Sequence, residues 1–397
     1  MVKSKYLIIG NGIAGTTAAE NIRKNDSQAQ ITIVTNENTP FYARIRLHEY
    51  IAGEISKDQL VVRKENWYQD KDIDLLTGVQ ISAIDIDEKL AIAEDGRRFE
   101  YDKLLYSAGS HSFVPRINGN NLDGVFSLRS IDDADRIIEY KNGKSSAVIL
   151  GGGLLGLEIG FSMIQSGMEV TVVELSDHLL PKQLDKEAGA FLKMQMEKMG
   201  FNFILGDSAT EIIAKNSSCV DRVLLKSGVV ISTDMVLISA GVRPNIALAK
   251  NSGIDINLGL LVNKNMQTSV TDVYAAGDLI EFDNRLYGSW MIAMEQGKLA
   301  AQNMTGINTD YQGSVMSMML KVVGIELGSV GNHDPDHELE SKIIHTEESF
   351  KRIVFDQGRV VGCVMIGDKK GLGPISRHIV QKDLVADIDP SLIELSS

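Results

Sequence analysis

Three glycines recur at one fixed spacing twice along this 397-residue chain, and each set is followed by a carboxylate. The second set is Gly151, Gly153 and Gly156, with Glu174 following the last glycine by 18 positions (174 minus 156). In a G-x-G-x-x-G turn the first glycine permits a sharp bend, the second leaves room for a pyrophosphate, and the third lets a helix pack closely on a strand. A carboxylate at the later position can accept both hydroxyls of an adenosine ribose. The pattern predicts dinucleotide binding.

The first set lies near the start of the chain. It comprises Gly10, Gly12 and Gly15, and Glu37 follows Gly15 by 22 positions (37 minus 15). A single match is weak evidence, because glycine-rich turns that bind nothing have the same pattern. Two complete matches about 140 residues apart support each other. We therefore expect two dinucleotide-binding units.

Strands and helices are expected around both turns in the same order: strand, glycine turn, helix, second strand. The predicted ranges are 6–9, 16–23 and 31–34 in the first unit, and 147–150, a helix that breaks near Gly167, and 170–173 in the second. Each unit later reaches a strand that ends on small residues, at 104–106 before Ala108-Gly109 and at 235–238 before Ala240-Gly241. A repeat of this length predicts duplication of a whole domain.

The composition changes again from about Tyr311. Antiparallel strands are expected at 315–330, 342–345, 352–356 and 359–366, with a hairpin turn at 356–358, a final helix over 372–384, and before them a helix at 291–303. The sequence thus predicts the α/β class, with two Rossmann-like domains and a small α+β C-terminal domain. The expected boundaries are 1–115 with 245–310 for the first domain, 116–244 for the second and 311–397 for the third.

Charge and cysteine content exclude several functions. With 53 acidic and 40 basic residues the net charge is −13, so the chain has no overall attraction for nucleic acid or an anionic membrane. Only Cys219 and Cys363 are present, without a C-x-x-C motif, which argues against a disulfide framework and a cysteine-ligated metal site and suits a reducing cytoplasm. The N-terminal residues show no signal-peptide pattern, and no apolar run approaches the length of a membrane span.

Taken together, these residues resemble the pyridine-nucleotide-dependent flavoprotein reductases of the glutathione-reductase-like superfamily, from residue 6 to about 370. The chain is most similar in appearance to NADH:rubredoxin reductases and to the flavin-binding part of assimilatory NADH nitrite reductases. The resemblance implies the glutathione-reductase-type fold with FAD and NADH as cofactors. The matching segments are IIGNGIAG (8–15), Glu37, 42–47, 107–109, 128–130, GGGLLGLE (151–158), 240–245, 274–278 and 296–301.

The resemblance implies that FAD lies on the first unit, with its pyrophosphate on the glycine turn, its adenosine ribose on Glu37 and its phosphates near Arg44. Ile81 would contact the adenine and Asp278 the ribityl chain. Trp290 and the start of its helix would face the flavin pyrimidine, where the helix dipole stabilises the anion of reduced flavin. The residues assigned to FAD are Gly10, Gly12, Ile13, Ala14, Gly15, Glu37, Arg44, Ile81, Ala108, Gly109, Arg129, Asp278 and Trp290.

The second unit would hold NADH, with its ribose on Glu174 and its nicotinamide near Glu158. Glu174 would repel the 2′-phosphate of NADPH, and residues 175–177 include no arginine that could offset this repulsion. His178 is the one nearby group that opposes a preference for NADH. The other residues assigned to NADH are Gly151, Gly153, Leu155, Gly156 and Gly241.

Two departures from the superfamily pattern bear on the reaction. Its disulfide reductases and NADH peroxidases carry a redox cysteine in the helix after the first ribose carboxylate, and residues 41–53 contain none, so a thiol mechanism is not expected. Ferredoxin-reductase relatives place a lysine against flavin N5 where Glu49 stands here. Arg46 and Lys321 are the candidates for that contact, although Arg44 and Arg46 also suit a solvated helix start.

We expect NADH to give hydride to N5 of FAD, and the reduced flavin to pass electrons singly to a small, rubredoxin-like redox protein. The cofactors would carry this chemistry, so no metal, nucleophile or general acid is required. An acidic carrier would need a basic docking face, and Lys369, Lys370, Arg377 and Lys382 are either that face or an ordinary solvated surface.

Other functions remain open. The chain could be an NADH oxidase that reduces O2, an electron-donating subunit for a nitrite or nitric oxide reductase, or a flavoprotein that senses NADH with negligible turnover. The sequence also leaves the choice between monomer and homodimer open.

Overall fold

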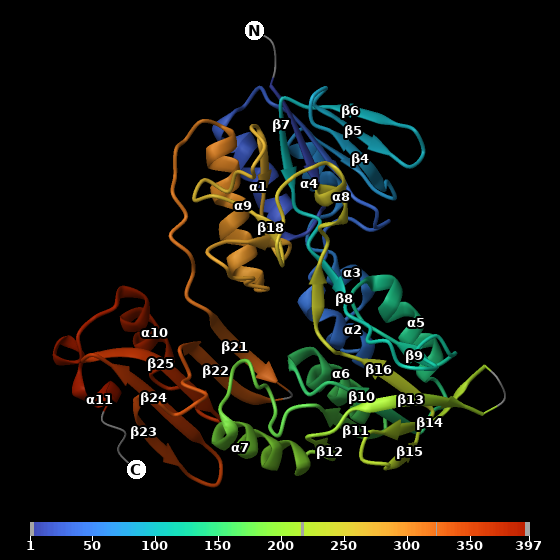
Figure 1. Ribbon diagram of the computed structural model, residues 1–397, viewed down its shortest axis with the longest axis vertical. Helices are drawn as coiled ribbons and strands as arrows, with labels where there is room; N and C mark the ends of the chain where they lie inside the picture. Colours follow the sequence, from blue (N-terminus) through green and yellow to red (C-terminus); the bar gives the residue numbers. More distant parts are fainter. Residues whose placement is uncertain (1–3, 216–217, 323, 394–397) are drawn as a thin grey trace. The chain divides into compact units, whose positions relative to one another are not determined.

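The computed structural model describes residues 4–215, 218–322 and 324–393, with residues 318–322 described as strand backbone only. The chain forms two compact units, each assembled from separate segments, which can be followed by colour in Figure 1. Unit 1 comprises Met1–Arg44, Ser56–His111 and Val242–Ser314. Unit 2 comprises Ile45–Ile55, Ser112–Gly241 and Val315–Ser397.

A five-stranded parallel sheet in the order β19-β7-β1-β2-β3 forms the centre of unit 1. Ile8 in the middle strand pairs with Ile33 on one side and Leu105 on the other, and all three are fully buried. Such apolar strands suit a parallel sheet, which is covered on both faces. The bounds are β1 Lys5–Ile9, β2 Gln30–Val34, β3 Ile73–Leu76, β7 Lys103–Tyr106 and β19 Val273–Ala275.

Helices α1 (Ile13–Asn25) and α9 (Trp290–Met304) pack directly against each other in unit 1 (Figure 1). A Cβ placed on Gly297 would lie 2.3 Å from the carbonyl oxygen of Ala14, so this approach requires glycine. The helices predicted at 16–23 and 291–303 are therefore both confirmed. Helix α1 begins three residues earlier than predicted (16 minus 13), because it starts inside the glycine turn.

Smaller elements complete unit 1. A hairpin turn follows Ala93, with the Gly96 amide donating to the Ala93 carbonyl at 3.0 Å. The smaller elements are β4 Ile81–Asp85, β5 Leu90–Ala93, β6 Arg98–Glu100, α3 Lys57–Leu60, α4 Glu65–Asp70, α8 Ala247–Asn251, β18 Leu260–Leu261 and β20 Ile280–Glu281, with β8 Ser110–Ser112 paired to β17 Val242–Pro244.

Unit 2 contains a second five-stranded parallel sheet, in the order β12-β11-β10-β16-β9. The helix that follows its glycine turn, α6, ends before Gly167, which has φ +82°, as predicted. Helix α5 begins after Ser130, whose side chain accepts from the Asp133 amide in a capping box. The bounds are β9 Val125–Phe126, α5 Ile131–Lys141, β10 Ser146–Leu150, α6 Leu154–Gln165, β11 Glu169–Glu174, α7 Lys186–Glu197, β12 Phe201–Leu205, β13 Ala209–Ala214, β14 Val220–Leu225, β15 Val230–Ser232 and β16 Met235–Ile238.

A short helix, α2 (Leu47–Ala52), belongs to unit 2 although the chain on either side of it belongs to unit 1. It follows the 3-10 turn η1 (Arg44–Arg46) and ends at Gly53, which has φ +80°. The Ser162 hydroxyl on α6 donates to the His48 carbonyl at 2.9 Å, so α2 is tied to α6 by a hydrogen bond from a side chain to the backbone.

The C-terminal part of unit 2 is a five-stranded antiparallel sheet in the order β21-β22-β25-β24-β23, drawn orange to red in Figure 1. The range 315–330, predicted to be antiparallel strand, forms two antiparallel strands on either side of Gly324, where φ is +88°. The predicted hairpin at 356–358 is confirmed, with positive φ at Gln357 and Gly358. The strand bounds are β21 Ser317–Val322, β22 Ile325–Gly331, β23 Glu340–His345, β24 Phe350–Asp356 and β25 Arg359–Ile366.

The helix predicted over 372–384 is shorter than expected and is not the last one. Helix α10 (Leu372–Gln381) stops where Lys382 adopts a left-handed conformation, and η2 (Val385–Asp387) and α11 (Pro390–Ile393) follow it. Among the helices of the described residues, none is long and apolar enough to cross a membrane.

A buried ion cluster joins the C-terminal sheet to the start of α7 within unit 2. Arg352 on β24 donates to Asp185, which caps α7 through the Ala188 amide at 2.8 Å. The other terminal nitrogen of Arg352 lies 2.9 Å from Asp334. The Arg352 and Asp185 side chains are both 0% exposed, so these charges compensate one another without water.

Candidate functional site: two dinucleotide cradles

The first glycine turn follows β1 in unit 1 and can be built only from glycine at two positions. Gly10 has φ +110°, and a Cβ there would lie 2.4 Å from the Ser107 carbonyl oxygen. A Cβ on Gly15 would lie 2.1 Å from the Gly10 carbonyl oxygen. At Gly12, by contrast, a Cβ would meet no protein atom within 4 Å. The turn therefore packs tightly on its own strand and stays open in front of Gly12, where a pyrophosphate needs room.

The second glycine turn, after β10 in unit 2, repeats this geometry. Gly151 has φ +119°, with the Ser239 carbonyl oxygen 2.3 Å from a hypothetical Cβ, and Gly156 would meet the Gly151 carbonyl oxygen at 2.2 Å. The space in front of Gly153 is open. Each turn leads into a helix whose first amides lack intrahelical partners and favour an anion. Both turns therefore fit a dinucleotide.

The first glycine turn contains a buried hydrogen-bond donor that has no acceptor among the described residues. The Asn11 side chain, 9% exposed, accepts hydrogen bonds from Tyr68 (3.0 Å) and Thr16 (3.3 Å). Its amide nitrogen is buried and has no hydrogen-bond partner among the described residues. A buried N–H without an acceptor is costly, and a phosphate oxygen would supply one. Sequence reasoning did not select Asn11, although its place between the two first glycines was a signal.

The carboxylates predicted to bind ribose are held differently in the two units. Glu174 accepts from the backbone amides of Gly152 (2.6 Å) and Ser176 (2.7 Å), which fixes it beside the second glycine turn. Glu37 instead accepts from the Tyr42 hydroxyl (2.5 Å) and from Arg44 (2.6 Å). Arg44 therefore contacts Glu37, the carboxylate that the sequence assigned to the adenosine ribose, and the assignment of Arg44 to the phosphates stays a prediction.

The remaining FAD candidates of unit 1 lie on its sheet and on α9. Asp278 follows β19 and accepts from the Ser110 hydroxyl at 2.9 Å. Trp290, the first residue of α9, stacks on Phe41 with ring centroids 5.6 Å apart. The other candidates are Ile13 and Ala14 in the first turn of α1, Ile81 at the start of β4 with 4% exposure, and Ala108 and Gly109 directly after β7.

The remaining candidates of unit 2 are more dispersed. Arg129 precedes α5, and its backbone amide donates to Asp133. Leu155 lies in the first turn of α6, and Gly241 follows β16 with φ +94° and open space around it. Lys321 lies in β21, but its side chain is outside the described residues.

Arg46 and Glu158, two of the predicted catalytic residues, both contact other side chains. Arg46 forms a forked ion pair with Glu49, at 2.6 and 3.0 Å. Glu158 on α6 is 15% exposed, and its Oε2 lies 3.5 Å from Nδ1 of His48 on α2. Burial, followed by the negative charge of Glu49, raises the pKa of Glu158 to about 8. Sequence reasoning did not select His48, and its position directly before Glu49 was the only signal.

Both cysteines of the chain are free thiols. Cys219 is exposed and Cys363 is buried, and both belong to unit 2. Burial raises the pKa of the Cys363 thiol to about 12, which disfavours the thiolate. The described residues also include no group of three or more His, Cys, Asp or Glu that could hold a metal ion.

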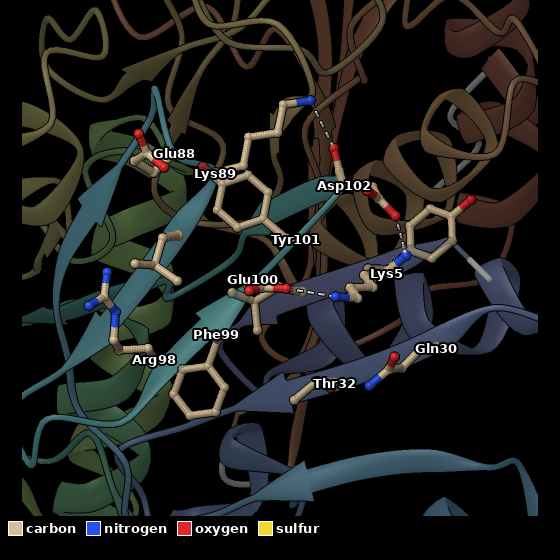
Figure 2. Close-up of a pocket in the computed structure, with 13 residues that line it drawn as sticks. Lys5, Gln30, Thr32, Glu88, Lys89, Arg98, Phe99, Glu100, Tyr101 and Asp102 are labelled. Atoms are coloured by element: carbon tan, nitrogen blue, oxygen red, sulfur yellow. Dashed lines mark hydrogen bonds and ion pairs between the residues drawn. The ribbon is translucent and has the colours of Figure 1, made fainter. Parts of the chain in front are cut away.

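An open polar pocket at the other end of the unit 1 sheet is a separate feature. It is lined by the first residues of β1 and β2 and by β5 and β6, whereas the glycine turn follows the carboxyl end of β1. Figure 2 shows the Lys5 side chain directed at Glu100, at 2.7 Å, and the Lys89 side chain directed at the backbone carbonyl of Asp102, at 3.5 Å. Lys89 is also paired, at 2.6 Å from Asp272. Nucleotides bind at the carboxyl ends of parallel strands, so this pocket is not a dinucleotide site.

Comparison with known proteins agrees with these two cradles. The chain belongs to the pyridine nucleotide-disulphide oxidoreductase family, whose model matches residues 4–297, and FAD and a pyridine nucleotide are the cofactors of this family. Residues 317–383 match the rubredoxin NAD+ reductase C-terminal domain. The expected fold class, an α/β protein with two dinucleotide-binding domains and a C-terminal domain, is confirmed.

Individual relatives point to electron transfer. The chain is 35% identical to "Nitrite reductase [NAD(P)H]" of Bacillus subtilis (strain 168), over 93% of this chain and 46% of that protein. It is 33% identical to the NADH-rubredoxin oxidoreductase of Clostridium acetobutylicum, over 93% of this chain and 94% of that protein. The crystal structure of NADH:rubredoxin oxidoreductase from Clostridium acetobutylicum superposes with a TM-score of 0.83 at 29% identity, covering 98% of each chain. The chain spans about half the length of the first curated relatives it matches.

Proposed function

We propose that this chain is an FAD-dependent NADH oxidoreductase that passes electrons from NADH to a small electron-carrier protein, most closely of the rubredoxin type. The observation that carries the proposal is the pair of glycine turns with the same close approaches, one in each compact unit. Two dinucleotides on one chain, one a flavin and one a nicotinamide, can exchange a hydride equivalent.

FAD is assigned to unit 1 and NADH to unit 2. When bound, FAD supplies the ability to accept two electrons and release them one at a time. Around it, Asn11 offers an amide to a phosphate oxygen, and Asp278 is oriented by Ser110. On unit 2, Glu174 is oriented by two backbone amides toward a ribose. The division into three domains, at 1–115 with 245–310, 116–244 and 311–397, remains part of this proposal.

A rubredoxin-type acceptor is supported by the match of residues 317–383 to the rubredoxin NAD+ reductase C-terminal domain. The predicted docking face in this region is electrostatically mixed. Lys369 lies 3.3 Å from Glu326, and the Lys370 amide donates to Asp368. Arg377 is exposed, and Lys382 follows α10. This face therefore stays a prediction, as does location in a reducing cytoplasm.

Rapid mixing tests the proposal. Under anaerobic conditions NADH should bleach the bound flavin within seconds, and oxidised rubredoxin should then restore its absorbance much faster than air does. A flavin that bleaches slowly and stays reduced with every carrier would contradict the proposal and favour a protein that senses NADH. Reoxidation fastest in air would favour an NADH oxidase that reduces O2.

A second function is favoured by the relatives of greater length. Because the chain covers about half of the Bacillus subtilis nitrite reductase, it is also suited to be the electron-donating part of a nitrite-reducing assembly. Reoxidation of the reduced flavin by a nitrite or nitric oxide reductase, and not by rubredoxin, would select this function. Sedimentation of the FAD-bound protein would decide between monomer and homodimer.

A further inference from the structure

Two titratable, partly buried side chains lie next to each other where α2 packs on α6, within unit 2. The His48 side chain is 23% exposed and the Glu158 side chain 15%, and 3.5 Å separates His48 Nδ1 from Glu158 Oε2. Nδ1 is buried and makes no hydrogen bond to any described residue. Contacts in ligand-free active sites are often this long and tighten when substrate binds.

The backbone holds the two residues in place. The hydroxyl of Ser162 lies 2.9 Å from the His48 carbonyl and 3.1 Å from the Glu158 carbonyl, so one side chain links both. From α5, Lys141 donates to the Ile51 carbonyl at 2.6 Å and fixes the other end of α2. His48 and Glu158 therefore face each other because of how α2 is anchored, which makes a specific pairing possible.

The surrounding charges do not neutralise Glu158. Arg46 is the nearest cation along the chain, and its guanidinium is already forked onto Glu49. Glu54 at the end of α2 adds a further negative charge. Asp135 on α5 accepts from the Tyr50 hydroxyl and is engaged there. A second carboxylate charge at Glu158 would be poorly compensated in this environment.

We propose that His48 is a positioning residue for Glu158 and that the two share one proton at neutral pH, with the Glu158 carboxyl as donor and His48 Nδ1 as acceptor. The inference rests on the proposed function only in placing a nicotinamide near Glu158. The pair itself is a property of unit 2.

The directions in which the pKa values of His48 and Glu158 are shifted favour a neutral pair over an ion pair. Burial lowers the pKa of His48, and the charge of Arg46 acts in the same direction, against opposing effects of Glu49, Glu54 and the Ile45 backbone. Burial and Glu49 raise the pKa of Glu158 to about 8. Below that pH the carboxyl keeps its proton, and above it the proton passes to solvent. A nicotinamide that gives up hydride gains positive charge, which a nearby carboxylate stabilises, so loss of this proton should accelerate hydride donation.

Titration of the histidine tests the pair without any turnover. NMR spectra of the FAD-bound protein with 15N-labelled histidine should show His48, assigned by its loss in H48N, as neutral at pH 7. In E158Q its midpoint should move by less than about 0.5 pH units, because Glu158 is uncharged in that range. A His48 midpoint above 7 that falls by more than about one unit in E158Q would identify an ion pair and overturn the proposal.

Flavin reduction tests the role of the pair. The anaerobic rate of reduction by NADH should rise with pH around a midpoint near 8 in the wild type and be independent of pH in E158Q. H48L removes the acceptor, so the midpoint should fall by about one unit, whereas H48N keeps an acceptor oxygen and should stay close to the wild type. E139Q, at an exposed position of α5, is the control, because Glu139 does not act on the pKa of either residue of the pair.

The same midpoint in H48L and the wild type, or in E158Q and the wild type, would contradict the role of the pair. If NADH reduces the flavin at no pH, the proposed function fails, and the NMR titration still decides whether the pair exists.

Discussion

Nη2 of Arg352 lies 2.9 Å from Oδ2 of Asp334, and both side chains are at most 4% exposed. Together with Asp185 they place one cation between two carboxylates in the interior of unit 2. The cluster links β24 to the cap of α7, which follows the segment after Glu174. Arg352 is therefore a structural residue that fixes the C-terminal sheet to the start of α7.

Replacing Arg352 by methionine should destabilise the protein strongly. Two buried carboxylates would lose their shared cation, and breaking a buried pair costs roughly 3–5 kcal/mol. Urea unfolding of R352M should show this loss, whereas R377M, at an exposed position of α10, should stay within about 0.5 kcal/mol of the wild type. An R352M variant as stable as R377M would mean that the cluster contributes no net stability.

Alanine substitutions at two glycines of the first turn should affect different properties of the protein. In G12A the added methyl group meets no protein atom, so the FAD-free protein should keep its melting temperature while FAD binds at least about tenfold more weakly. In G15A the methyl group would lie 2.1 Å from a backbone oxygen, so the melting temperature itself should fall. Thermal unfolding and FAD titration measure both effects. Normal FAD affinity in G12A would place the pyrophosphate elsewhere.

Glu174 should control the choice of coenzyme. Changing it to glutamine removes the charge that repels a 2′-phosphate, so the ratio of kcat/KM for NADPH to that for NADH should rise about tenfold. Adding L175R at a side chain that is 73% exposed should raise the ratio further, because a guanidinium can bind the phosphate. E169Q, exposed on the same strand, is the control. An unchanged ratio in the double variant would show that the 2′ position does not face Glu174.

Neither cysteine should be needed for activity. Iodoacetamide should label the exposed Cys219 in the native protein and reach Cys363 only after unfolding, because burial raises its pKa to about 12. NADH-dependent flavin reduction should be the same in the C219S variant and in fully labelled native protein. A rate of flavin reduction more than about tenfold lower in C219S than in the wild type would support a thiol mechanism.

Glu158 should make stability depend on pH in a defined window. Its folded pKa is about 8 against an ordinary value of 4.5, so the folded state holds a proton that the unfolded state loses between these values. Stability should therefore fall as the pH rises from about 5 to 8, by at most about 1.4 kcal/mol per pH unit. The stability difference between E158Q and the wild type should grow over this range and level off above it. A constant difference, like that expected for E139Q at an exposed position of α5, would place Glu158 in contact with water.

The sequence predicts the cradles well because their determinants are local. Gly10, Gly15 and the strands beside them form a contiguous pattern, and the structure shows the close backbone approaches that this pattern requires. The ends of the C-terminal elements were predicted poorly for a related reason. Apolar Leu384 continues the periodicity of α10, whereas the left-handed conformation of Lys382 that ends the helix has no glycine or proline to signal it.

The pairings that tune the site could not be predicted, because they join distant parts of the chain. His48 and Glu158 are 110 positions apart (158 minus 48), and Arg352 and Asp185 are 167 apart. Asn11 is adjacent to the predicted glycines, but its unpaired amide depends on where Tyr68 and Thr16 place their hydroxyl groups. Such contacts follow from tertiary packing and not from periodicity.

The interleaving of the two units has a consequence for how the protein is made. Six segments alternate between the units, so the chain passes from one to the other five times. During synthesis the first glycine turn emerges early, but β19, Asp278 and α9 of the same unit follow only after residue 242. Unit 1 therefore cannot close around a flavin until most of unit 2 has left the ribosome. Complete binding of FAD must wait until that stage of synthesis.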